Sequence, residues 1–572
     1  MPRDNGTQML ALAEQYLTEK NFASAEICLQ TILQTDSANS KANELLAYLL
    51  SGRGEQDLAL KHLSLACESP HCSRQALYSL GSYFLSKQQY LDSIHYLSRA
   101  IKSGGNFFEG LHDLGLANIG LKKFREGVRY LREALDLNPR SYEALNNLGA
   151  ALRNLGEFSE SLKYLGAAIN ANPSDAGAWL NKGVTFDSMG DFVAALDCYD
   201  QALRISPSYL EAICNKANAL QSMGRVDEAE ALYSRAIELS PGDADAHYNY
   251  SHLCLLNGNF QSGWEKFEAR WRSVDAPSYL PGAIPLLSAT QNVSGKKVLV
   301  WAEQGLGDTI QFCRYIALLS KHGAKVTLLV QSALAELLKD LDGVEGLEID
   351  YPKNLAEFDF QIPLMSLPLL FKTDLTNIPV NIPYILPNSD KVEYWRSQIA
   401  TKDRLKVGIV WSGGFRKDSP SLWSVNGRRN IPFLEMAVLQ DVEGVDFYSL
   451  QKGEPAESEF LEEGPKLWTQ ANLINVAPKL KDFSDTAALI ENLDLVITVD
   501  TSTAHLAAAM GKPVWILNRF DACWRWLRDR SDSPWYPSVQ LYRQVNSGDW
   551  SELMTRVVTD LKELVTKTSI TR

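Results

Sequence analysis

Several features common in membrane, secreted and nucleic-acid-binding proteins are missing from this sequence of 572 residues. No uncharged apolar run reaches the ~20 residues that span a bilayer, and the start, MPRDNGTQML, lacks the apolar segment of a secretory signal. The formal net charge of −13 argues against the broadly basic surface that nucleic-acid binding requires. The eight cysteines include no C-x-x-C pair, and no disulfide framework is indicated. We therefore expect a soluble protein of the reducing cytoplasm, with no membrane span and no nucleic-acid partner.

A period of 34 residues runs through the first half of the chain. It appears in a series of prolines and in two series of small residues: Pro139, Pro173, Pro207 and Pro241; Gly81, Gly115, Gly149 and Gly183, continued by Ala217; and Gly156, Gly190, Gly224 and Gly258. The first small-residue series predicts close approach of two antiparallel helices, the second predicts the turn between them, and the prolines end each second helix. The pattern resembles the tetratricopeptide repeat over roughly residues 40–277, with weaker helical pairs before it. Such repeats stack into a superhelix whose concave groove binds peptides or partner helices.

Short β-branched runs alternate with helical stretches after residue 275. Seven of these runs read as buried strands: residues 296–303, 325–331, 358–364, 405–411, 445–451, 493–500 and 513–518. The alternation predicts parallel sheets covered by helices, and the segment IPVNIPYILP at 378–387 separates two sets of strands. We therefore predict an all-α superhelix over residues 1–277, followed by an α/β unit of two Rossmann-like domains over residues 278–385 and 386–572.

A glycine-rich loop follows the first predicted strand. Its glycines, Gly305 and Gly307, allow a tight turn and a close approach by a bound donor. Ile310 replaces the third glycine of a dinucleotide fingerprint and Gln331 replaces its acidic residue, which argues against nicotinamide binding. The order strand, GLGD, helix resembles the N-terminal domain of bacterial heptosyltransferases and of related tetratricopeptide-linked glycosyltransferases. The resemblance implies that Asp308 deprotonates the acceptor hydroxyl; the alternative is that Asp308 only caps the helix.

A second motif follows the strand predicted at 493–500. The strand ends at Asp500, and Thr501, Ser502 and Thr503 open a helix whose first turn carries His505. Backbone N–H groups, hydroxyls and the helix dipole meet there, so the segment predicts a pyrophosphate site in which His505 donates a hydrogen bond or carries positive charge. The segment resembles the donor-binding stretch D-T-G-x-x-H of the heptosyltransferases, with serine in place of the glycine. The alternative is ordinary capping beside a histidine buried in the core.

Further donor contacts are predicted in the same domain. Ser412 and Gly413 end the strand 405–411 in small residues, where a phosphate or ribose can approach. Arg429, or its neighbour Arg428, is a candidate partner for the leaving diphosphate. Gln451 stands where the related family places an acidic residue that contacts the nucleoside.

Two more segments have a structural and a functional interpretation. Asp485 and Thr486 either cap a helix or touch the donor. The aromatic residues of CWRWLRDRSDSPWYP at 523–537 either stack on a sugar or pack between the domains.

No metal site is predicted from the sequence. The triplet Asp340-Leu341-Asp342 in the α/β half ends a helical stretch, whereas a metal-dependent transferase would place D-x-D after a strand. The leaving diphosphate would then be stabilised by helix termini, His505 and arginine.

A further register of the 34-residue period consists of asparagines. Asn147, Asn181, Asn215 and Asn249 each lie two residues before the small-residue position of the first helix. An amide side chain can bind both the N–H and the C=O of a peptide. The register resembles the asparagine ladder of O-linked N-acetylglucosamine transferase, which implies that these residues bind an acceptor polypeptide. The alternative is that they tie adjacent repeats together.

Together these features predict an inverting, metal-independent glycosyltransferase of the GT-B fold. The nucleotide-diphosphate sugar is its substrate, no cofactor is expected, and the acceptor is protein recruited through the groove. The architecture resembles O-linked N-acetylglucosamine transferase, whereas the motifs resemble the heptosyltransferases over about residues 296–550. Two alternatives stay open: a transferase that acts on glycan or lipopolysaccharide, and a non-catalytic repeat scaffold with a degenerate transferase domain.

Overall fold

The computed structural model describes residues 3–273, 282, 284–399, 404–414 and 423–571. Its contacts divide the chain into two compact units, one of Met1–Met189 with Asp197–Pro207 and one of Gly190–Leu196 with Ser208–Arg572. The predicted domain boundary at 277/278 lies outside the described residues. The second unit therefore contains the last two helical repeats as well as the α/β part.

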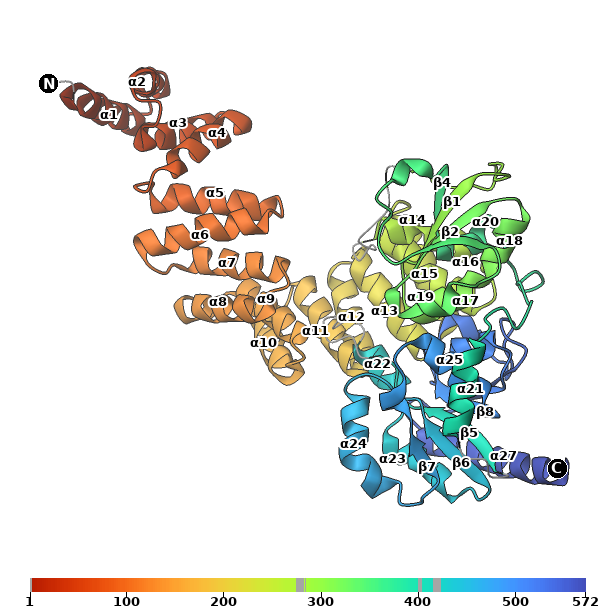
Figure 1. Cartoon of the computed structure of the whole chain (residues 1–572). Helices are drawn as coiled ribbons and strands as arrows, with labels where there is room; N and C mark the ends of the chain where they lie inside the picture. Colours follow the sequence, from red (N-terminus) through yellow and green to blue (C-terminus); the bar gives the residue numbers. More distant parts are fainter. Residues whose placement is uncertain (1–2, 274–281, 283, 400–403, 415–422, 572) are drawn as a thin grey trace. The chain divides into compact units, whose positions relative to one another are not determined.

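Antiparallel helix pairs form the repeats (Figure 1). The pairs are α1 Arg3–Thr18 with α2 Phe22–Thr35, α3 Ser40–Gly52 with α4 Gln56–Glu68, α5 Arg74–Ser86 with α6 Tyr90–Gly104, α7 Phe108–Gly120 with α8 Phe124–Leu137, α9 Tyr142–Asn154 with α10 Phe158–Ala171, α13 Leu210–Ser222 with α14 Val226–Leu239, and α15 Ala244–Leu256 with α16 Phe260–Phe267. Between the fifth and sixth of these pairs the chain forms α11 Ala176–Met189 and α12 Phe192–Ile205. The pair α1–α2 is the helical pair that was predicted before residue 40.

The small-residue series acts as predicted. A β-carbon on Gly149 would stand 2.5 Å from Cγ of Leu165 on the paired helix, and Gly115 has the same relation to Leu131 at 2.8 Å. The second series lies in the turn with positive φ, 79° at Gly156, and the same position holds Lys122 with φ of 59°. The backbone of the turn is therefore kept even where the chain has no glycine.

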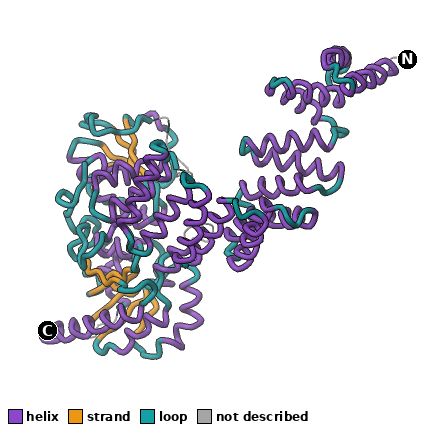
Figure 2. Tube along the Cα trace, turned by 180° about the vertical axis from the view of Figure 1, so that it is seen from behind, coloured by secondary structure: helices purple, strands orange, loops and turns teal. Residues whose placement is uncertain are grey.

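The first sheet of the α/β part has four parallel strands in the order β3-β2-β1-β4 (Figure 2, orange). The strands are β1 Lys297–Trp301, β2 Lys325–Leu329, β3 Val344–Glu348 and β4 Phe360–Pro363. The accompanying helices are α17 Leu306–Phe312, α18 Ile316–Lys321, α19 Ser332–Leu338 and α20 Leu367–Leu370, with 3-10 turns η1 Glu268–Trp271, η2 Cys313–Tyr315, η3 Leu355–Glu357 and η4 Leu364–Ser366.

The second sheet has six parallel strands in the order β10-β9-β8-β5-β6-β7. The strands are β5 Leu405–Val410, β6 Val445–Ser449, β7 Leu473–Asn475, β8 Leu495–Val499, β9 Val514–Asn518 and β10 Val539–Arg543. The helices are α21 Ser389–Gln398, α22 Trp423–Arg429, α23 Phe433–Met436, α24 Ala456–Leu467, α25 Phe483–Glu491, α26 Ser502–Ala509 and α27 Trp550–Thr571, with η6 Ala437–Asp441, η7 Ala477–Lys479 and η8 Trp524–Trp526. The strand order reverses between β5 and β8, and the ligand of a doubly wound sheet binds beyond the carboxyl ends of such strands.

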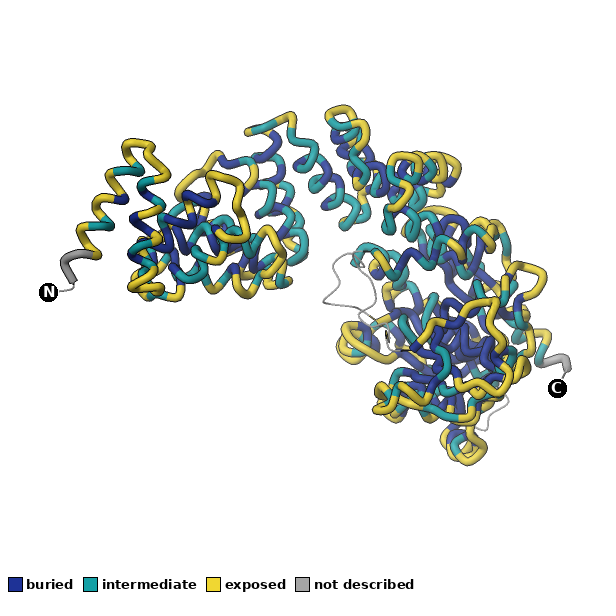
Figure 3. Tube along the Cα trace, turned by 90° about the horizontal axis from the view of Figure 1, so that it is seen from above, coloured by how far each residue is buried: buried dark blue, intermediate teal, exposed yellow. Residues whose placement is uncertain are grey.

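All seven predicted strands are present, as β1, β2, β4, β5, β6, β8 and β9. The inner strands β5, β6, β8 and β9 are buried along almost their whole length, and Val407, Phe447, Ile497 and Val499 are fully buried. Figure 3 colours the buried residues dark blue. Within the described residues, every helix is too short or too polar to cross a bilayer. The fold class is therefore as predicted, an α-helical repeat array followed by two Rossmann-like domains.

Candidate functional site

Asp308 lies in the first turn of α17, directly beyond the carboxyl end of β1. Oδ2 of its carboxylate accepts a hydrogen bond from the backbone N–H of Gly305 at 2.9 Å, so Asp308 does cap this helix. The preceding loop is fixed by Gln331, whose Nε2 donates to the carbonyl of Gln304 at 2.7 Å and whose Oε1 accepts from Thr309 at 3.0 Å. Gln331, which the sequence shows only as a departure from a dinucleotide motif, thus positions the loop.

The second motif begins α26 beyond the carboxyl end of β8. Thr501 is the N-cap residue, and its hydroxyl accepts from the N–H of Ala504 at 3.4 Å and contacts the Thr498 hydroxyl at 3.0 Å. Asp500 and Ser502 are partly exposed, whereas Thr503 is buried. The predicted anion site is therefore a capped helix start that keeps Asp500 and Ser502 accessible.

His505 is buried and neutral. Its ring stacks on Trp526 with 5.2 Å between centroids, its Nδ1 lies 3.0 Å from the Tyr536 hydroxyl, and its Nε2 lies 3.9 Å from Oδ1 of Asp500. Burial lowers the pKa of His505 to about 4, and the nearby carboxylate of Asp500 only partly opposes this shift. Burial thus favours the neutral ring near neutral pH, and the neutral ring can donate one hydrogen bond; a positive charge beside a phosphate stays a prediction.

Glycine lets the two motifs meet. A β-carbon on Gly307 would stand 3.0 Å from Cδ2 of His505 and 3.5 Å from Cα of Ser502, so only glycine allows α17 and α26 to pack this closely. The predicted base and the predicted donor motif, 197 residues apart in the sequence, thus lie in one centre.

Arg525 completes this centre, although no role for it was predicted from the sequence. Its guanidinium forms an ion pair with Oδ1 of Asp308, donates to Sγ of Cys523 at 3.1 Å and lies 4.2 Å from the centroid of the Trp524 ring. The charges of Asp308 and Asp500 raise the pKa of Arg525 above its ordinary value despite burial, so the side chain is a permanent cation. The only signal in the sequence was an arginine between two tryptophans.

The aromatic stretch packs between elements and is not exposed to a sugar. Trp524, Trp526, Trp535 and Tyr536 are all at most 5% exposed. Trp535 contacts Phe312 of α17 at 5.7 Å between ring centroids, and the last repeat adds two further rings, those of Phe260 and Trp264. Of the two interpretations, packing is confirmed and sugar stacking by these rings is wrong for this conformation.

The cradle after β5 is held by side chains that were predicted to contact the donor. Oε1 of Gln451 accepts from the N–H groups of Trp411 and Ser412 at 3.1 and 2.9 Å, and its Nε2 donates to the carbonyl of Ser412 at 3.0 Å. Arg429 packs over Gly413, where a β-carbon would stand 2.5 Å from Nη2, and it donates to Asn426 at 3.0 Å. Gln451 therefore shapes the Ser412–Gly413 turn, and direct nucleotide contact by Gln451 or Arg429 stays a prediction.

Three other candidates make structural contacts. Arg428 forms an ion pair with Asp521 at 2.9 Å. Asp485 lies in the first turn of α25 and pairs with Lys391 at 2.9 Å, while the Thr486 hydroxyl donates to the carbonyl of Asp482. The capping interpretation accounts for Asp485 and Thr486.

A buried ion pair joins the end of the repeats to the strand that precedes Asp308. Arg270 of η1, 1% exposed, contacts Oε1 of Glu303 at 3.1 Å and the Ser366 hydroxyl at 2.7 Å. Burial raises the pKa of Glu303 to about 7, against the opposing charge of Arg270. Glu303 is thus enclosed and anchors the end of the repeats.

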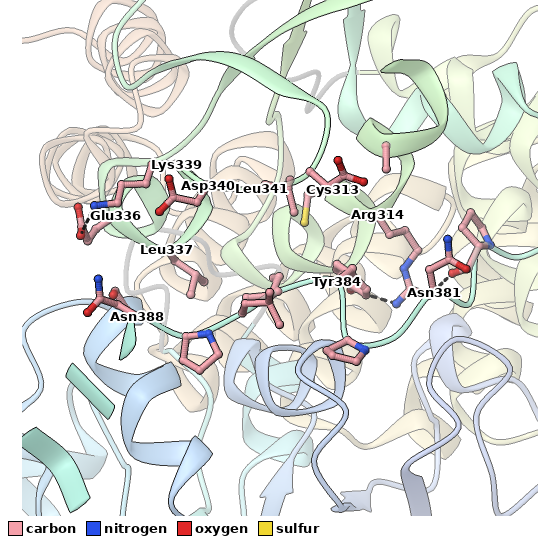
Figure 4. Close-up of a pocket in the computed structure, with 18 of the residues that line it drawn as sticks. Cys313, Arg314, Glu336, Leu337, Lys339, Asp340, Leu341, Asn381, Tyr384 and Asn388 are labelled. Carbon is pink, nitrogen blue, oxygen red and sulfur yellow. Dashed lines mark hydrogen bonds and ion pairs between the residues drawn. The ribbon is translucent and has the colours of Figure 1, made fainter. Parts of the chain in front are cut away.

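A cavity of about 330 Å³ lies beside the linker between the Rossmann-like domains, away from Asp308 (Figure 4). Arg314 and Tyr384 form part of its wall, with a 3.0 Å hydrogen bond between them that Figure 4 shows as a dashed line. The Tyr384 hydroxyl lies 3.5 Å from that of Tyr536, which contacts His505. A chain of hydroxyl groups therefore connects the cavity wall to the site histidine.

The asparagines of the repeats have neighbours within the first unit. Asn147 contacts His112 at 3.1 Å, and Asn181 donates to Asn146 at 2.9 Å and accepts from Arg153 at 3.3 Å. Asn215 and Asn249 are partly exposed on α13 and α15 of the second unit. The contacts of Asn147 and Asn181 fit the alternative that they tie repeats together, and peptide binding stays a prediction.

Among the described residues, no group of three or more His, Cys, Asp or Glu side chains is placed to hold a metal ion. Asp340 and Asp342 both lie at the wall of the linker cavity, beyond α19.

Comparison with known proteins agrees with this architecture. The model of glycosyltransferase family 9 (heptosyltransferase) matches residues 444–517, which include Gln451, Asp500 and His505. Models of the tetratricopeptide repeat match residues 112–162, 176–209 and 210–243. The chain therefore combines tetratricopeptide repeats with a glycosyltransferase family 9 domain.

One curated relative and two solved structures illustrate the similarity. Protein FlbA of Caulobacter vibrioides is 27% identical over 340 residues, 54% of this chain and 54% of that protein, so the chain spans about half the length of this relative. YrrB, described as a TPR protein with an unusual peptide-binding site, is 26% identical over 32% of this chain and 95% of its own, with a TM-score of 0.29. TTC0263, a thermophilic TPR protein of Thermus thermophilus, is 25% identical over 32% of this chain and 100% of its own, with a TM-score of 0.30.

Proposed function

We propose that this chain is an inverting glycosyltransferase that needs no metal ion and transfers a sugar from a nucleotide-diphosphate donor to protein recruited by the repeats. The observation that carries the proposal is the meeting of Asp308 with the start of α26 at the contact of Gly307 and His505. This centre lies beyond the carboxyl ends of β1 and β8, where a doubly wound fold binds its ligand. The family 9 match covers the α26 side of it.

The residues supply separate functions in this reaction. The backbone N–H groups at Thr501–Thr503 bind the diphosphate, because a helix start favours an anion. Asp308 accepts the proton of the acceptor hydroxyl as its oxygen attacks the anomeric carbon, and neutral His505 donates a hydrogen bond near the diphosphate. Ser412 and Gly413 leave room for the nucleotide beyond β5.

The donor is tested with the whole chain against UDP-, GDP-, CMP- and ADP-sugars. We expect one of them to raise the melting temperature, because a ligand that binds only the folded state stabilises it, and to be hydrolysed slowly without acceptor. If no donor raises the melting temperature and none is hydrolysed, the degenerate-scaffold alternative is favoured. Hydrolysis that disappears in EDTA and returns with Mg²⁺ or Mn²⁺ would contradict the metal-independent mechanism.

The acceptor is tested with the double variant Asn181→Ala, Asn215→Ala. Loss of each amide contact should weaken binding of an acceptor polypeptide by about 0.5–1.5 kcal/mol while donor hydrolysis is unchanged. Asn170→Ala, an exposed position on α10, is the matched control. Because Asn181 also contacts Asn146 and Arg153, the melting temperature is measured alongside.

A glycan acceptor is the second candidate. It is favoured by the engagement of Asn147 and Asn181 with neighbouring side chains, which leaves their amides less available to a peptide. Transfer to free glycans that is unaffected by the double variant would support it.

A further inference from the structure

Arg525 is the cation of the centre formed by Asp308, Asp500 and His505. Its guanidinium contacts one carboxylate oxygen of Asp308 and the sulfur of Cys523, and it is 12% exposed. A thiol is a weak acceptor, so in the described part of the chain Asp308 is its only strong partner. Asp500, at the start of α26, is the next carboxylate that acts on its charge. Arg525 thus lies within electrostatic range of Asp500, next to the helix start at which the diphosphate is proposed to bind.

The other nearby cations have different partners. Arg314 donates to the carbonyls of Pro379 and Trp535 and to Tyr384. Arg428 is paired with Asp521, and His505 is neutral because burial lowers its pKa. Arg525 is therefore the cation that is held by Asp308 itself.

Asp308 has both carboxylate oxygens engaged in this structure. Oδ2 accepts the N–H of Gly305 and Oδ1 is paired with Arg525. The oxygen Oδ1 is occupied by this charge-assisted contact, so the guanidinium has to leave before an acceptor hydroxyl can bind there. The residue proposed as the base is therefore restrained while no donor is bound.

Building on the proposed function, we propose that Arg525 is a further catalytic residue that exchanges partners: it leaves Asp308 and binds the diphosphate of the donor. A diphosphate offers several charged oxygens to the planar guanidinium, so it competes well with a single carboxylate oxygen. Donor binding then releases Oδ1 of Asp308, and the base becomes available only when there is a sugar to transfer.

The transfer step balances with these groups. The acceptor oxygen forms a bond to the anomeric carbon, and its proton passes to Oδ1 of Asp308. The bond between the anomeric carbon and the phosphate oxygen breaks, its electron pair stays on the diphosphate, and Arg525 pairs with the added negative charge. No metal or redox partner is needed.

The test measures binding of inorganic pyrophosphate to the whole chain by calorimetry. Arg525→Met should weaken binding about tenfold or more, the value of a charge-assisted contact, and Arg525→Lys should lose less. Asp308→Asn should strengthen binding severalfold, because the ion pair no longer has to be broken. Arg528→Met in the same loop, where the side chain is 41% exposed, is the matched control and should bind like the wild type.

The two single changes are expected to move the pyrophosphate affinity in opposite directions, which the loss of a merely structural ion pair would not do. The double variant Asp308→Asn, Arg525→Met leaves no unpaired charge and should bind as weakly as Arg525→Met. Equal pyrophosphate affinity in the wild type, Arg525→Met and Asp308→Asn would overturn the proposal, as would absence of binding to the folded wild type at millimolar pyrophosphate. Turnover of nucleotide-sugars is measured in parallel. Turnover without these affinity changes would refute only the partner exchange. The affinity changes without any turnover would refute the proposed enzymatic function but not the partner exchange.

Discussion

Gly307 and His505 touch across the two Rossmann-like domains, with room for no side chain at position 307: a β-carbon there would lie 3.0 Å from Cδ2 of the imidazole. We predict that Gly307→Ala separates α17 from α26 by a few tenths of an ångström and lowers turnover about tenfold or more, because transfer depends on the geometry of groups from both helices. Gly427→Ala, which meets no heavy atom within 4 Å, is the control. The measurement is the steady-state rate and the melting temperature of both variants. Unchanged turnover in Gly307→Ala would show that sugar transfer does not depend on the contact between Gly307 and His505.

Asp308→Asn separates the two roles of this residue. An asparagine oxygen still accepts the N–H of Gly305, so the helix cap is kept, but the amide cannot accept a proton. We therefore expect turnover to fall by about 10²–10⁴, a loss typical of a missing general base, and the melting temperature to fall because buried Arg525 loses its carboxylate partner. Asp482→Asn at the N-cap of α25 is the corresponding change in a cap that has no proposed catalytic role. Retention of turnover in Asp308→Asn would leave capping as the only function of the carboxylate.

The pH dependence of stability should reflect the buried histidines. Burial lowers the pKa of His252 and of His505 to about 4, against about 6.5 in the unfolded chain. As the pH falls, the unfolded chain binds these protons first, so this stability is fully present above pH ~6.5 and is lost between ~6.5 and ~4. Glu303, whose pKa is raised to about 7, acts with the opposite sign: its contribution is lost as the pH rises through 7.

A comparison of variants separates the contribution of His252 to the unfolding free energy from those of His505 and Glu303. His252→Gln should reduce the loss of unfolding free energy between pH 6.5 and 4 by about 1–2 kcal/mol, a value that allows for its partial exposure. His322→Gln, at an exposed position, should leave the pH profile as in the wild type. Denaturant unfolding at several pH values provides the measurement, and parallel profiles for all three proteins would argue against a neutral His252.

The turns between paired helices offer a test of backbone strain. Lys122 has φ of 59° where the next repeat has Gly156 with φ of 79°. Since this region costs an L-residue about 1–2 kcal/mol, Gly156→Ala should lower the unfolding free energy by about that much. Lys122→Gly should raise it, by less, because glycine also loses more entropy on folding. Gly166→Ala, in a helix with open space around it, should be neutral or slightly stabilising. Melting temperatures that do not follow this order would place the strain elsewhere.

The strands that the sequence predicted share a simple property: they are continuous apolar runs buried on both faces. The three strands it did not predict, β3, β7 and β10, lie toward the edges of their sheets. Val344–Glu348 carries two glutamates and a glycine, and Leu473–Asn475 has three residues, so neither shows a buried-strand pattern. Their pairing is decided by the neighbouring strand and not by their own composition.

The site was predictable where the chemistry is local. The helix starts at Asp308 and at Thr501–Thr503 follow from capping residues beyond a strand, and both are present. Arg525 could not be found in this way, because its ion pair joins residues 217 positions apart. Nor did the sequence reveal that the amide of Gln451 is engaged by the backbone of Ser412. Partners of long side chains depend on tertiary packing, which a single sequence does not reveal.

The rings of Phe260 and Trp264, held against Trp535 and Trp524, bear on how such a chain can be recombined. A chimaera that replaces everything up to residue 277 would discard these rings together with Arg270, and would leave the aromatic face of the transferase uncovered. Repeats should instead be exchanged at a junction between two earlier helix pairs, where one pair follows the next with the same 34-residue pattern. The last repeats therefore behave as a fixed adaptor, since Phe192 also lies under Arg428, and lineages or designers that vary the length of the array should find their freedom upstream of Gly190.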